Sequence, residues 1–325
     1  MLNLGRSIPN FPPSAIPDRW RQLYNDNTVT YTIRKMSNKL SQIIAQINSD
    51  KLIYEINDKQ ELIKLIRPAI GFRTDKSSDN DLEIGKSKFG GQPDLPKSFV
   101  WPTYNNEPLT FCGQFNCSEF THFDIEKQLP PKGIFSVFTF IDKNHPGFLI
   151  NKNSFHFSYF DNIEDLQRTD FPVNYFKEGI FETASIEYFE HYNLPWANGF
   201  KFEEIKQNFI NIESFYLLES DINEIIRNVT GQGYLTNQIL GENYVDMDLS
   251  FVETKLDIRT QEDFQKNVNS MLEMRKNFVP IIQFSYNDPN TNMDRFGDGT
   301  AGFGLEVDDL TNLEFLKVSM GFQPY

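Results

Sequence analysis

The chain has 325 residues, of which 39% are hydrophobic and 23% are charged, and its formal net charge is −14 at pH 7. This hydrophobic content is enough to bury a core in one or two domains, and it excludes an intrinsically disordered chain. Because nucleic-acid binding depends on clustered Lys and Arg, the negative charge argues against a nucleic-acid partner and favours a basic protein or a cation.

The cysteine content and the hydropathy of the chain indicate where it is found. Cys112 and Cys117 are too few for a disulfide framework. The first residues lack the apolar segment of a signal peptide, and no run of about 20 apolar residues is present for a membrane span. We therefore expect a cytoplasmic protein with no membrane partner.

Two amphipathic helices are predicted after an N-terminal arm. Residues 1–17 contain four prolines, which fix φ and remove backbone donors, so the arm should be extended. Apolar residues recur at helical spacing across residues 40–47. Asp58 and Glu61 resemble a capping box for a second helix, which should end near Arg67 because a proline follows.

Strand signals dominate the remaining sequence. Residues 69–72 and 135–141 are apolar or β-branched runs. In residues 155–159, aromatic side chains alternate with His156 and Ser158, which predicts one buried face and one wet face. A long helix between two strand-rich halves is predicted from a stripe at spacings of three and four, made of Phe202, Ile205, Phe209, Ile212 and Tyr216.

The two strand-rich halves share a pattern. Gln114 lies in an apolar run and is followed by Gly133 at the start of a strand, and the separation from Gln283 to Gly302 is also 19 residues. Duplicated units would leave such an order of strand, loop, glycine and strand, although one equal spacing can also arise by coincidence. We expect an α+β fold with mixed or antiparallel sheets and flanking helices, and internal duplication of this unit is one alternative.

One stretch of the sequence is similar to a known family. The run Ser87–Pro96 contains the step Gly-Gly-x-Pro-x-Leu-Pro and is followed by Trp101-Pro102; together with residues 111–114, 129–135 and 296–298, it resembles the YwqG-like family, a domain of unknown function. The resemblance covers about 62–325 and is loose between 142 and 278, where Leu240-Gly241 keeps only part of the family's pattern. It implies an α+β fold and transfers no activity.

The resemblance also suggests a division of the chain into two parts. We assign residues 1–61 to the arm and the helices packed on the domain. Residues 62–325 then form the YwqG-like domain, which we expect to consist of two intertwined halves.

The Gly-Gly step provides the candidate binding residues. Glycines allow positive φ and the following prolines stiffen the chain, so the simplest interpretation is a rigid turn that packs the Trp101 ring. The alternative is a groove for a ligand or partner. Its candidates are Gly90, Gly91, Gln92, Trp101 and Gln114, to which we add Gln283 from the second half and Asp298 from the family's aromatic-Gly-Asp step.

Motifs for catalysis and for metal binding are incomplete. The Gly85-Lys86-Ser87 step lacks the first glycine of a phosphate loop. Residues 288–294 place oxygen side chains at alternate positions, but they lack the glycine and glutamate of an EF-hand, so a polar hairpin loop is favoured over a weak divalent-cation site. The four histidines lack paired spacing. We predict no catalytic residue, no resident metal and no cofactor.

Two functions of different class remain open. The leading hypothesis is a non-enzymatic protein-binding module, for which an immunity or antitoxin role toward a basic toxin is one version, because an acidic surface steers basic partners. The alternative is a small-molecule-binding protein or hydrolase with a pocket between the two halves.

Overall fold

The computed structural model describes residues 37–324 apart from 50–55, 143–149, 197–198, 200, 202–205, 210–211, 234–236 and 244–246. All described elements belong to one compact unit, Asn38–Tyr325. The proline-rich arm falls outside the described residues. Among the described helices, none combines the length and the apolar character that a membrane crossing requires.

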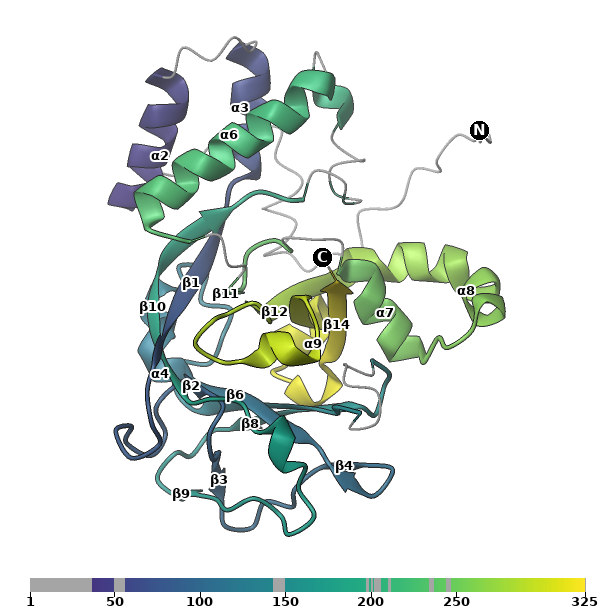
Figure 1. Cartoon of the computed structure of the whole chain (residues 1–325). Helices are drawn as coiled ribbons and strands as arrows, with labels where there is room; N and C mark the ends of the chain where they lie inside the picture. The colour runs from purple at the N-terminus through teal and green to yellow at the C-terminus, as the bar shows by residue number, and fades with distance from the viewer. Residues whose placement is uncertain are drawn as a thin grey trace. The chain divides into compact units, whose positions relative to one another are not determined.

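Three helices pack together at one end of the central strands (Figure 1). They are α2 (Asn38–Ser49), α3 (Ile56–Leu65) and α6 (Ile212–Thr230). Ile43, Ile47 and Ile222 are fully buried in their shared apolar cluster. The two predicted N-terminal helices are thus confirmed, but α3 begins at Ile56, so Asp58 lies within its first turn and the proposed capping box is wrong.

The long helix of the middle region lies further along the chain than predicted. Its described part begins at Ile212, and Lys206–Asn208 form the 3-10 helix η4. Leu218, Ile222 and Ile226 recur every four residues and are buried. This stripe positions the helix. Of the residues in the predicted stripe, Phe202 and Ile205 lie outside the described residues, and Phe209 lies between η4 and α6.

The main sheet has ten antiparallel strands in the order β14-β13-β12-β11-β1-β10-β2-β6-β7-β8. In the first part of the chain they are β1 (Arg67–Lys76), β2 (Lys88–Phe89), β6 (Thr110–Asn116), β7 (Ile134–Thr139) and β8 (Phe155–Phe160). In the second part they are β10 (Ala184–Asn193), β11 (Gln238–Ile239), β12 (Phe278–Ser285), β13 (Gly299–Glu306) and β14 (Ser319–Pro324). The α+β class and the strands predicted at 69–72, 135–141 and 155–159 are confirmed.

Shorter elements complete the domain. Two small sheets pair β3 (Asp94–Pro96) with β9 (Leu166–Arg168), and β4 (Thr103–Tyr104) with β5 (Glu107–Pro108). The other helices among the described residues are α4 (Cys117–Phe120), α7 (Asp248–Leu256), α8 (Gln261–Met274) and α9 (Val307–Thr311). The remaining 3-10 helices are η2 (Thr121–Phe123), η3 (Lys177–Gly179), η5 (Arg275–Asn277), η6 (Met293–Phe296) and η7 (Phe315–Lys317).

The strand order is symmetric about the centre of the sheet. There Arg73 of β1 faces Glu187 of β10, and the two side chains form a bidentate ion pair with N–O distances of 2.8 and 3.1 Å. Ile70 lies three residues before Arg73 on β1 and pairs with β11. Ala184 lies three residues before Glu187 on β10 and pairs with β2. The first strand of each half therefore pairs with the second strand of the other half.

The same irregularity occurs in both halves. A β-bulge lies at Cys112 in β6 and at Ile281 in β12, two residues before Gln114 and Gln283 respectively. The bulged carbonyl accepts a hydrogen bond from Gly90 N (2.9 Å) in one half and from Leu240 N (3.1 Å) in the other. We infer that Gly90-Gly91 and Leu240-Gly241 are equivalent turns, because all four residues have positive φ.

The equal 19-residue spacing noted in the sequence does not join equivalent residues. Gln114 faces Ser136 across the sheet, whereas Gln283 faces Gly302, so Gly302 corresponds to Ser136. Three residues earlier, Gly133 and Gly299 correspond to each other. The alignment from spacing is wrong because the two connecting loops differ in length by three residues. The matching registers support internal duplication, which stays a prediction.

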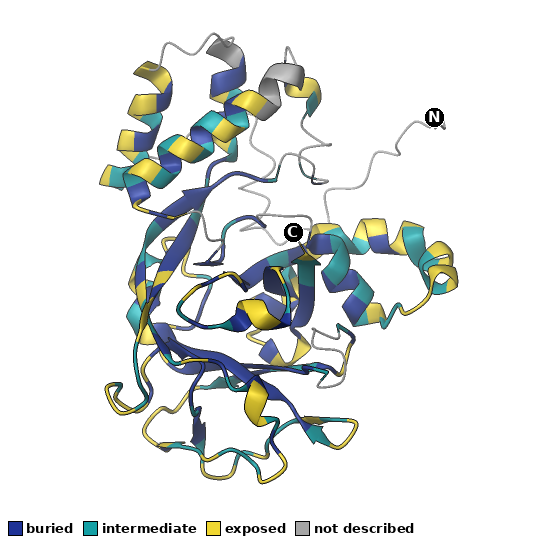
Figure 2. Ribbon diagram, in the orientation of Figure 1, coloured by how far each residue is buried: buried dark blue, intermediate teal, exposed yellow. Residues whose placement is uncertain are grey.

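The sheet curves around one apolar core. Phe157 of the end strand β8 lies 5.9 Å from Phe303 of β13, measured between ring centroids. On the neighbouring strands, Thr139 Oγ1 lies 3.8 Å from Met320 Sδ of the other end strand, β14. Contacts between opposite ends of a ten-stranded sheet require this curvature. The strands are accordingly buried along most of their length, as Figure 2 shows.

The outer face of each half has a different cover. Over β6–β8, residues 93–109 and their short strands supply an aromatic layer that includes Phe99 and Trp101. Over β12–β14, helix α7 presses Phe251 against glycines of the sheet, with α8 beside it (Figure 1). The aromatic layer buries Ser158 and half-buries His156. The predicted wet face of β8 is therefore wrong.

Candidate functional site

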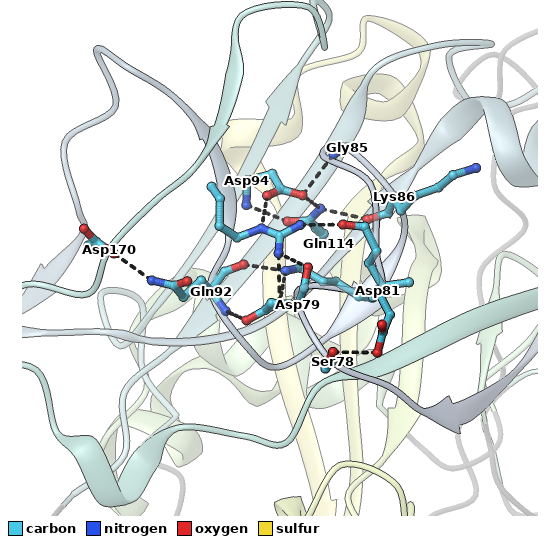
Figure 3. Close-up of polar contacts among 12 residues, drawn as sticks. Ser78, Asp79, Asp81, Gly85, Lys86, Gln92, Asp94, Gln114 and Asp170 are labelled. Atoms are coloured by element: carbon cyan, nitrogen blue, oxygen red, sulfur yellow. Dashed lines mark hydrogen bonds and ion pairs between the residues drawn. The ribbon is translucent and has the colours of Figure 1, made fainter.

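A buried charged network lies behind the Gly-Gly turn (Figure 3). Lys88 on β2 has no exposed surface, and its Nζ lies 2.5 Å from Asp79 Oδ1 and 2.5 Å from the carbonyl oxygen of Gln92. Burial lowers the pKa of Lys88, and the hydrogen bond that Lys88 donates to Asp79 opposes that shift. Arg168 Nε donates to Asp94 Oδ1 at 2.6 Å and so holds β9 against β3.

Gln114 connects this network to the sheet. Its Oε1 accepts from the Asp94 backbone N–H at 2.8 Å. Its Nε2 donates to Asp94 Oδ2 and to the Lys86 carbonyl oxygen, both at 2.8 Å. Both ends of the fully buried amide thus have partners within the protein. These contacts favour a structural role in positioning the turn.

The glycines of the turn are enclosed. A side chain at Gly90 would place its Cβ 2.3 Å from the Glu182 carbonyl oxygen, and one at Gly91 would place it 2.4 Å from an Asp79 carboxylate oxygen. Both glycines also have positive φ, at 58° and 63°. The structure brings Gly90, Gly91, Gln92 and Gln114 together, as expected, but this packing leaves no open groove at the glycines.

Trp101 lies in the aromatic layer and not in the charged network. Its Nε1 donates to the Leu109 carbonyl oxygen at 2.9 Å. Its half-buried ring meets the rings of Phe138 and Tyr175 edge-on, with centroid distances of 5.5 Å in each case. Trp101 therefore fixes the loop that leads to β4.

The two candidates from the second half lie apart from the first set. Gln283 Nε2 donates to the Glu242 carbonyl oxygen at 3.3 Å. The neighbouring Gln238 Nε2 donates to the same oxygen at 2.6 Å, in the position that Lys88 occupies in the first half. Asp298 lies on an exposed loop, where its Oδ1 accepts from Asn287 at 2.5 Å.

The polar loop at residues 288–294 is organised by hydrogen bonds to one buried carboxylate. Asp288 accepts from Thr74 Oγ1 at 2.8 Å, from Asn237 Nδ2 at 3.1 Å and from the Asn290 backbone N–H at 3.0 Å. These donors account for the oxygen-rich pattern in the sequence. Within the described residues, no group of three His, Cys, Asp or Glu side chains is arranged to hold a metal ion.

A pocket lies where the two ends of the sheet meet. Its volume is about 670 Å³. Residues 152–157 of the first half line one side, together with residues 102–103 and Leu109. Residues 254–256 at the end of α7 and residues 316–319 at the start of β14 line the other side.

The pocket follows the symmetry of the sheet. His156 on β8 faces Phe138, and Ser319 on β14 faces Gly304, so His156 and Ser319 are equivalent positions. Both residues line the pocket. The pocket thus lies between the corresponding edges of the two halves.

The charged residues of the pocket lining are all basic. They are Lys152, Lys255 and Lys317. Lys255 Nζ lies 2.7 Å from Glu306 Oε1, and Lys317 Nζ lies 2.8 Å from Asp309 Oδ1. Hydrogen bonds that Lys317 donates to Asp309 and Glu314 raise the pKa of Lys317, so it remains protonated. Lys152 is exposed, and no ion pair joins it to another described residue.

A serine–histidine pair lies on β8 beside the pocket. His156 Nε2 lies 2.7 Å from Ser158 Oγ, and burial lowers the pKa of His156, which keeps the ring neutral. A nucleophile and its base have this geometry, but a hydrolase also needs a group that orients the other ring nitrogen. No acidic side chain of the described chain hydrogen-bonds to His156. The pair is therefore an incomplete catalytic arrangement.

The chain belongs to the family described as Domain of unknown function (DUF1963), which it matches over residues 87–323. The match includes both intertwined halves from β2 onward, and it contains the residues of the pocket. Comparison with curated proteins gives no match. The family places no constraint on the activity, which has to be argued from the geometry.

Proposed function

We propose that this chain is a small-molecule-binding protein and that its ligand occupies the pocket between the two halves. The observation that carries this proposal is a cavity of about 670 Å³ whose lining comes from both edge strands. Small-molecule sites usually measure about 300–1,000 Å³ and often form between structural halves. The functional alternative predicted from the sequence therefore has more structural support than the protein-binding hypothesis.

Binding is favoured over hydrolysis at this site. Ser158 is buried and its hydroxyl is engaged with His156. Ser136, its neighbour across the sheet, has a buried hydroxyl with no hydrogen-bond partner and lies under the same aromatic layer. Attack by Ser158 on a substrate would require this layer to open, whereas binding requires no such rearrangement.

Ligand capture with a blocked pocket tests the proposal. Thr103 lines the pocket and is exposed, so Thr103→Trp should fill space at little cost to folding. Wild-type protein and the variant are incubated with a small-molecule extract of the native cells and desalted, and the released compounds are compared by mass spectrometry. We expect at least one compound to be retained by wild type and lost from the variant.

A matched surface variant controls for the added tryptophan. Thr311 is exposed on α9 and is not part of the pocket lining. Thr311→Trp should retain the same compound as wild type. Equal capture by all three proteins, or capture by none of them, would contradict the proposed site.

Protein binding remains a second candidate because of one surface feature. Val100 and Val173 are exposed, and each lies within two residues of Trp101 or Phe171, whose rings are in contact at 6.1 Å. Exposed apolar patches of this kind mark interaction sites. In this version a basic partner, such as a toxin in a cytoplasmic immunity pair, would be recognised by the acidic chain. We also propose that, within this family, the chain is YwqG-like, as the sequence resemblance indicates. This assignment supplies no activity.

A pull-down tests the protein-binding candidate. Val173→Lys removes the apolar side chain and adds a charge of the same sign as the partner, so it should abolish retention of a basic protein from the native lysate and leave the melting temperature unchanged. Retention of the same partner by Val173→Lys and by wild type would exclude this patch.

A further inference from the structure

We propose that the pocket between the halves selects an organic anion, with the negative group among the lysines and the apolar body against the phenylalanines of β8. This inference rests on the proposed function, because it names the class of ligand for the same pocket. Three features carry it, which are the charge of the lining, the availability of the lysines and the size of the cavity.

The charge of the lining is opposite to that of the whole chain. The chain has 45 acidic and 31 basic residues. Among the described residues, the lining nevertheless includes Lys152, Lys255 and Lys317 and no Asp or Glu. Composition alone would favour carboxylates at this surface, so the gathering of lysines is a local property of the site. An anion that enters the pocket can contact three ammonium groups, two of which are also paired with Glu306 and Asp309 outside the lining.

The lysines remain available to a ligand. Each ammonium group has three N–H donors, so Lys255 can keep its contact with Glu306 and still bind an anion. Lys317 contacts Asp309 and Glu314, and its side chain is 56% exposed. Ion pairs at such exposed positions are weak and exchange readily. The carboxylates therefore leave N–H donors of both lysines available to a ligand.

The size and the apolar part of the lining indicate an organic molecule. A cavity of about 670 Å³ is much larger than an inorganic phosphate or sulfate ion needs. Phe155 and Phe157 lie beside the lysine-bearing segments, and Leu109 and Val318 add aliphatic surface. The neutral ring of His156 adds a flat surface and no positive charge. A ligand with both an anionic group and an aromatic or aliphatic body would contact both parts.

Two dyes of similar shape test the inference. One is 8-anilinonaphthalene-1-sulfonate, an anion, and the other is N-phenyl-1-naphthylamine, which is neutral. The full chain is titrated with each dye and fluorescence gives the affinity. We expect the anion to bind about tenfold more tightly or better, because only the anion can accept charge-assisted hydrogen bonds from the lysines.

Charge-removing variants assign the effect to the pocket. The double variant Lys152→Gln with Lys317→Gln should weaken anion binding about tenfold and change binding of the neutral dye less than about twofold. Lys266→Gln, at an exposed lysine on α8, should change neither affinity. Thermal melting confirms that each variant folds, which excludes dye binding to partly unfolded protein.

The outcomes separate the two proposals. If both dyes bind equally well and Thr103→Trp displaces both, the pocket binds ligands but the preference for anions is wrong. If Thr103→Trp displaces neither dye, or if neither dye binds, the proposed function and this inference both fail. An anion preference that survives the double lysine variant would also overturn the inference.

Discussion

The two halves of the sheet have the same strand plan and differ in what lies on its outer face. Ser136, Phe138 and Ser158 of the first half correspond to Gly302, Gly304 and Gly321 of the second. In the second half the glycines leave space that Phe251 of α7 fills. In the first half the sheet supplies its own large side chain at Phe138, and a loop segment covers it.

This difference affects the polar side chains on each outer face. In the second half, the contact of Phe251 with the glycines is apolar, and the sheet keeps the buried polar side chains of Gln283 and Ser319. The loop cover of the first half encloses Gln114, Ser136 and Ser158, and it leaves His156 at the edge of the pocket. The first half thus has serines at two positions where the second half has glycines, which adds buried hydroxyl groups to its outer face.

The largest effect is expected from emptying the first half's outer face. Phe138 is fully buried and contacts the rings of Phe99, Trp101 and Phe111. Phe138→Ala should lower the free energy of unfolding by about 3–5 kcal/mol, because the loop cover cannot collapse into the cavity. Urea unfolding measures the change. Phe138→Leu is the control, because it keeps most of the side-chain volume. It should lower the free energy of unfolding clearly less than Phe138→Ala.

A smaller effect is expected when the first half is given the second half's polar residue. Lys88→Gln places at β2 the residue that β11 has at Gln238. The variant loses the charged hydrogen bond to Asp79, so it should be less stable by about 1.5–3 kcal/mol. The exposed pair of Lys266 and Glu262 gives the control, since Lys266→Gln should cost less than about 1 kcal/mol. Equal costs would mean that the buried network contributes nothing particular to stability.

A third test concerns the glycines of the second half that contact Phe251, which are Gly302, Gly304 and Gly321. A Cβ at Gly304 would lie 2.4 Å from ring atoms of Phe251, so Gly304→Ala should cost about 1–2 kcal/mol through overpacking. Gly233→Ala is the matched control, because nothing lies within 4 Å of a Cβ there. If both variants were equally stable, α7 would not depend on the glycines for its position.

The smallest effect concerns pH. Burial lowers the pKa of His156 below 6.5, so below that pH the unfolded chain binds a proton more readily than the folded chain. Stability contributed by neutral His156 is therefore present above pH 6.5 and is lost as the pH falls toward the lowered pKa. His156→Ser, which copies Ser319 of the other half, should flatten this part of the profile. Urea unfolding between pH 5 and 7.5 gives the free energy of unfolding of wild type and of His156→Ser as a function of pH. Equal slopes for the two proteins would contradict the lowered pKa of His156.

Much of the fold could be predicted because its signals are local. Ile43 and Ile47 at helical spacing, and the apolar run at 135–141, indicate elements whose burial the structure confirms. The equivalent positions of the two halves can be recognised only in part from the sequence. The loop lengths differ, so the equal spacing matches Gly302 with Gly133, whereas the strand pairing matches Gly302 with Ser136. Register is set by cross-strand pairing, which spacing along one strand does not record.

A pocket between the two halves was one alternative from the sequence, but its lining could not be predicted, because it comes from distant segments. Residues 102–103, Leu109 and parts of 152–157, 254–256 and 316–319 meet only when the sheet curves and brings its two ends together. No motif accompanies them. The alternation around His156 was visible in the sequence, but its polar positions were interpreted as solvent-facing. A loop from residues 93–109 covers them, and nothing near His156 in the chain indicates that cover.

The most direct test of the pocket between the edge strands is a map of where an organic anion binds. Amide chemical shifts of isotope-labelled full chain are recorded during titration with 8-anilinonaphthalene-1-sulfonate. We predict that the largest changes occur at residues 152–157, 254–256 and 316–319, with little change at Lys88, Gly90 or Gln114. Changes centred on the Gly-Gly turn, or spread evenly over the surface, would contradict the assignment of the site to the junction of the two halves.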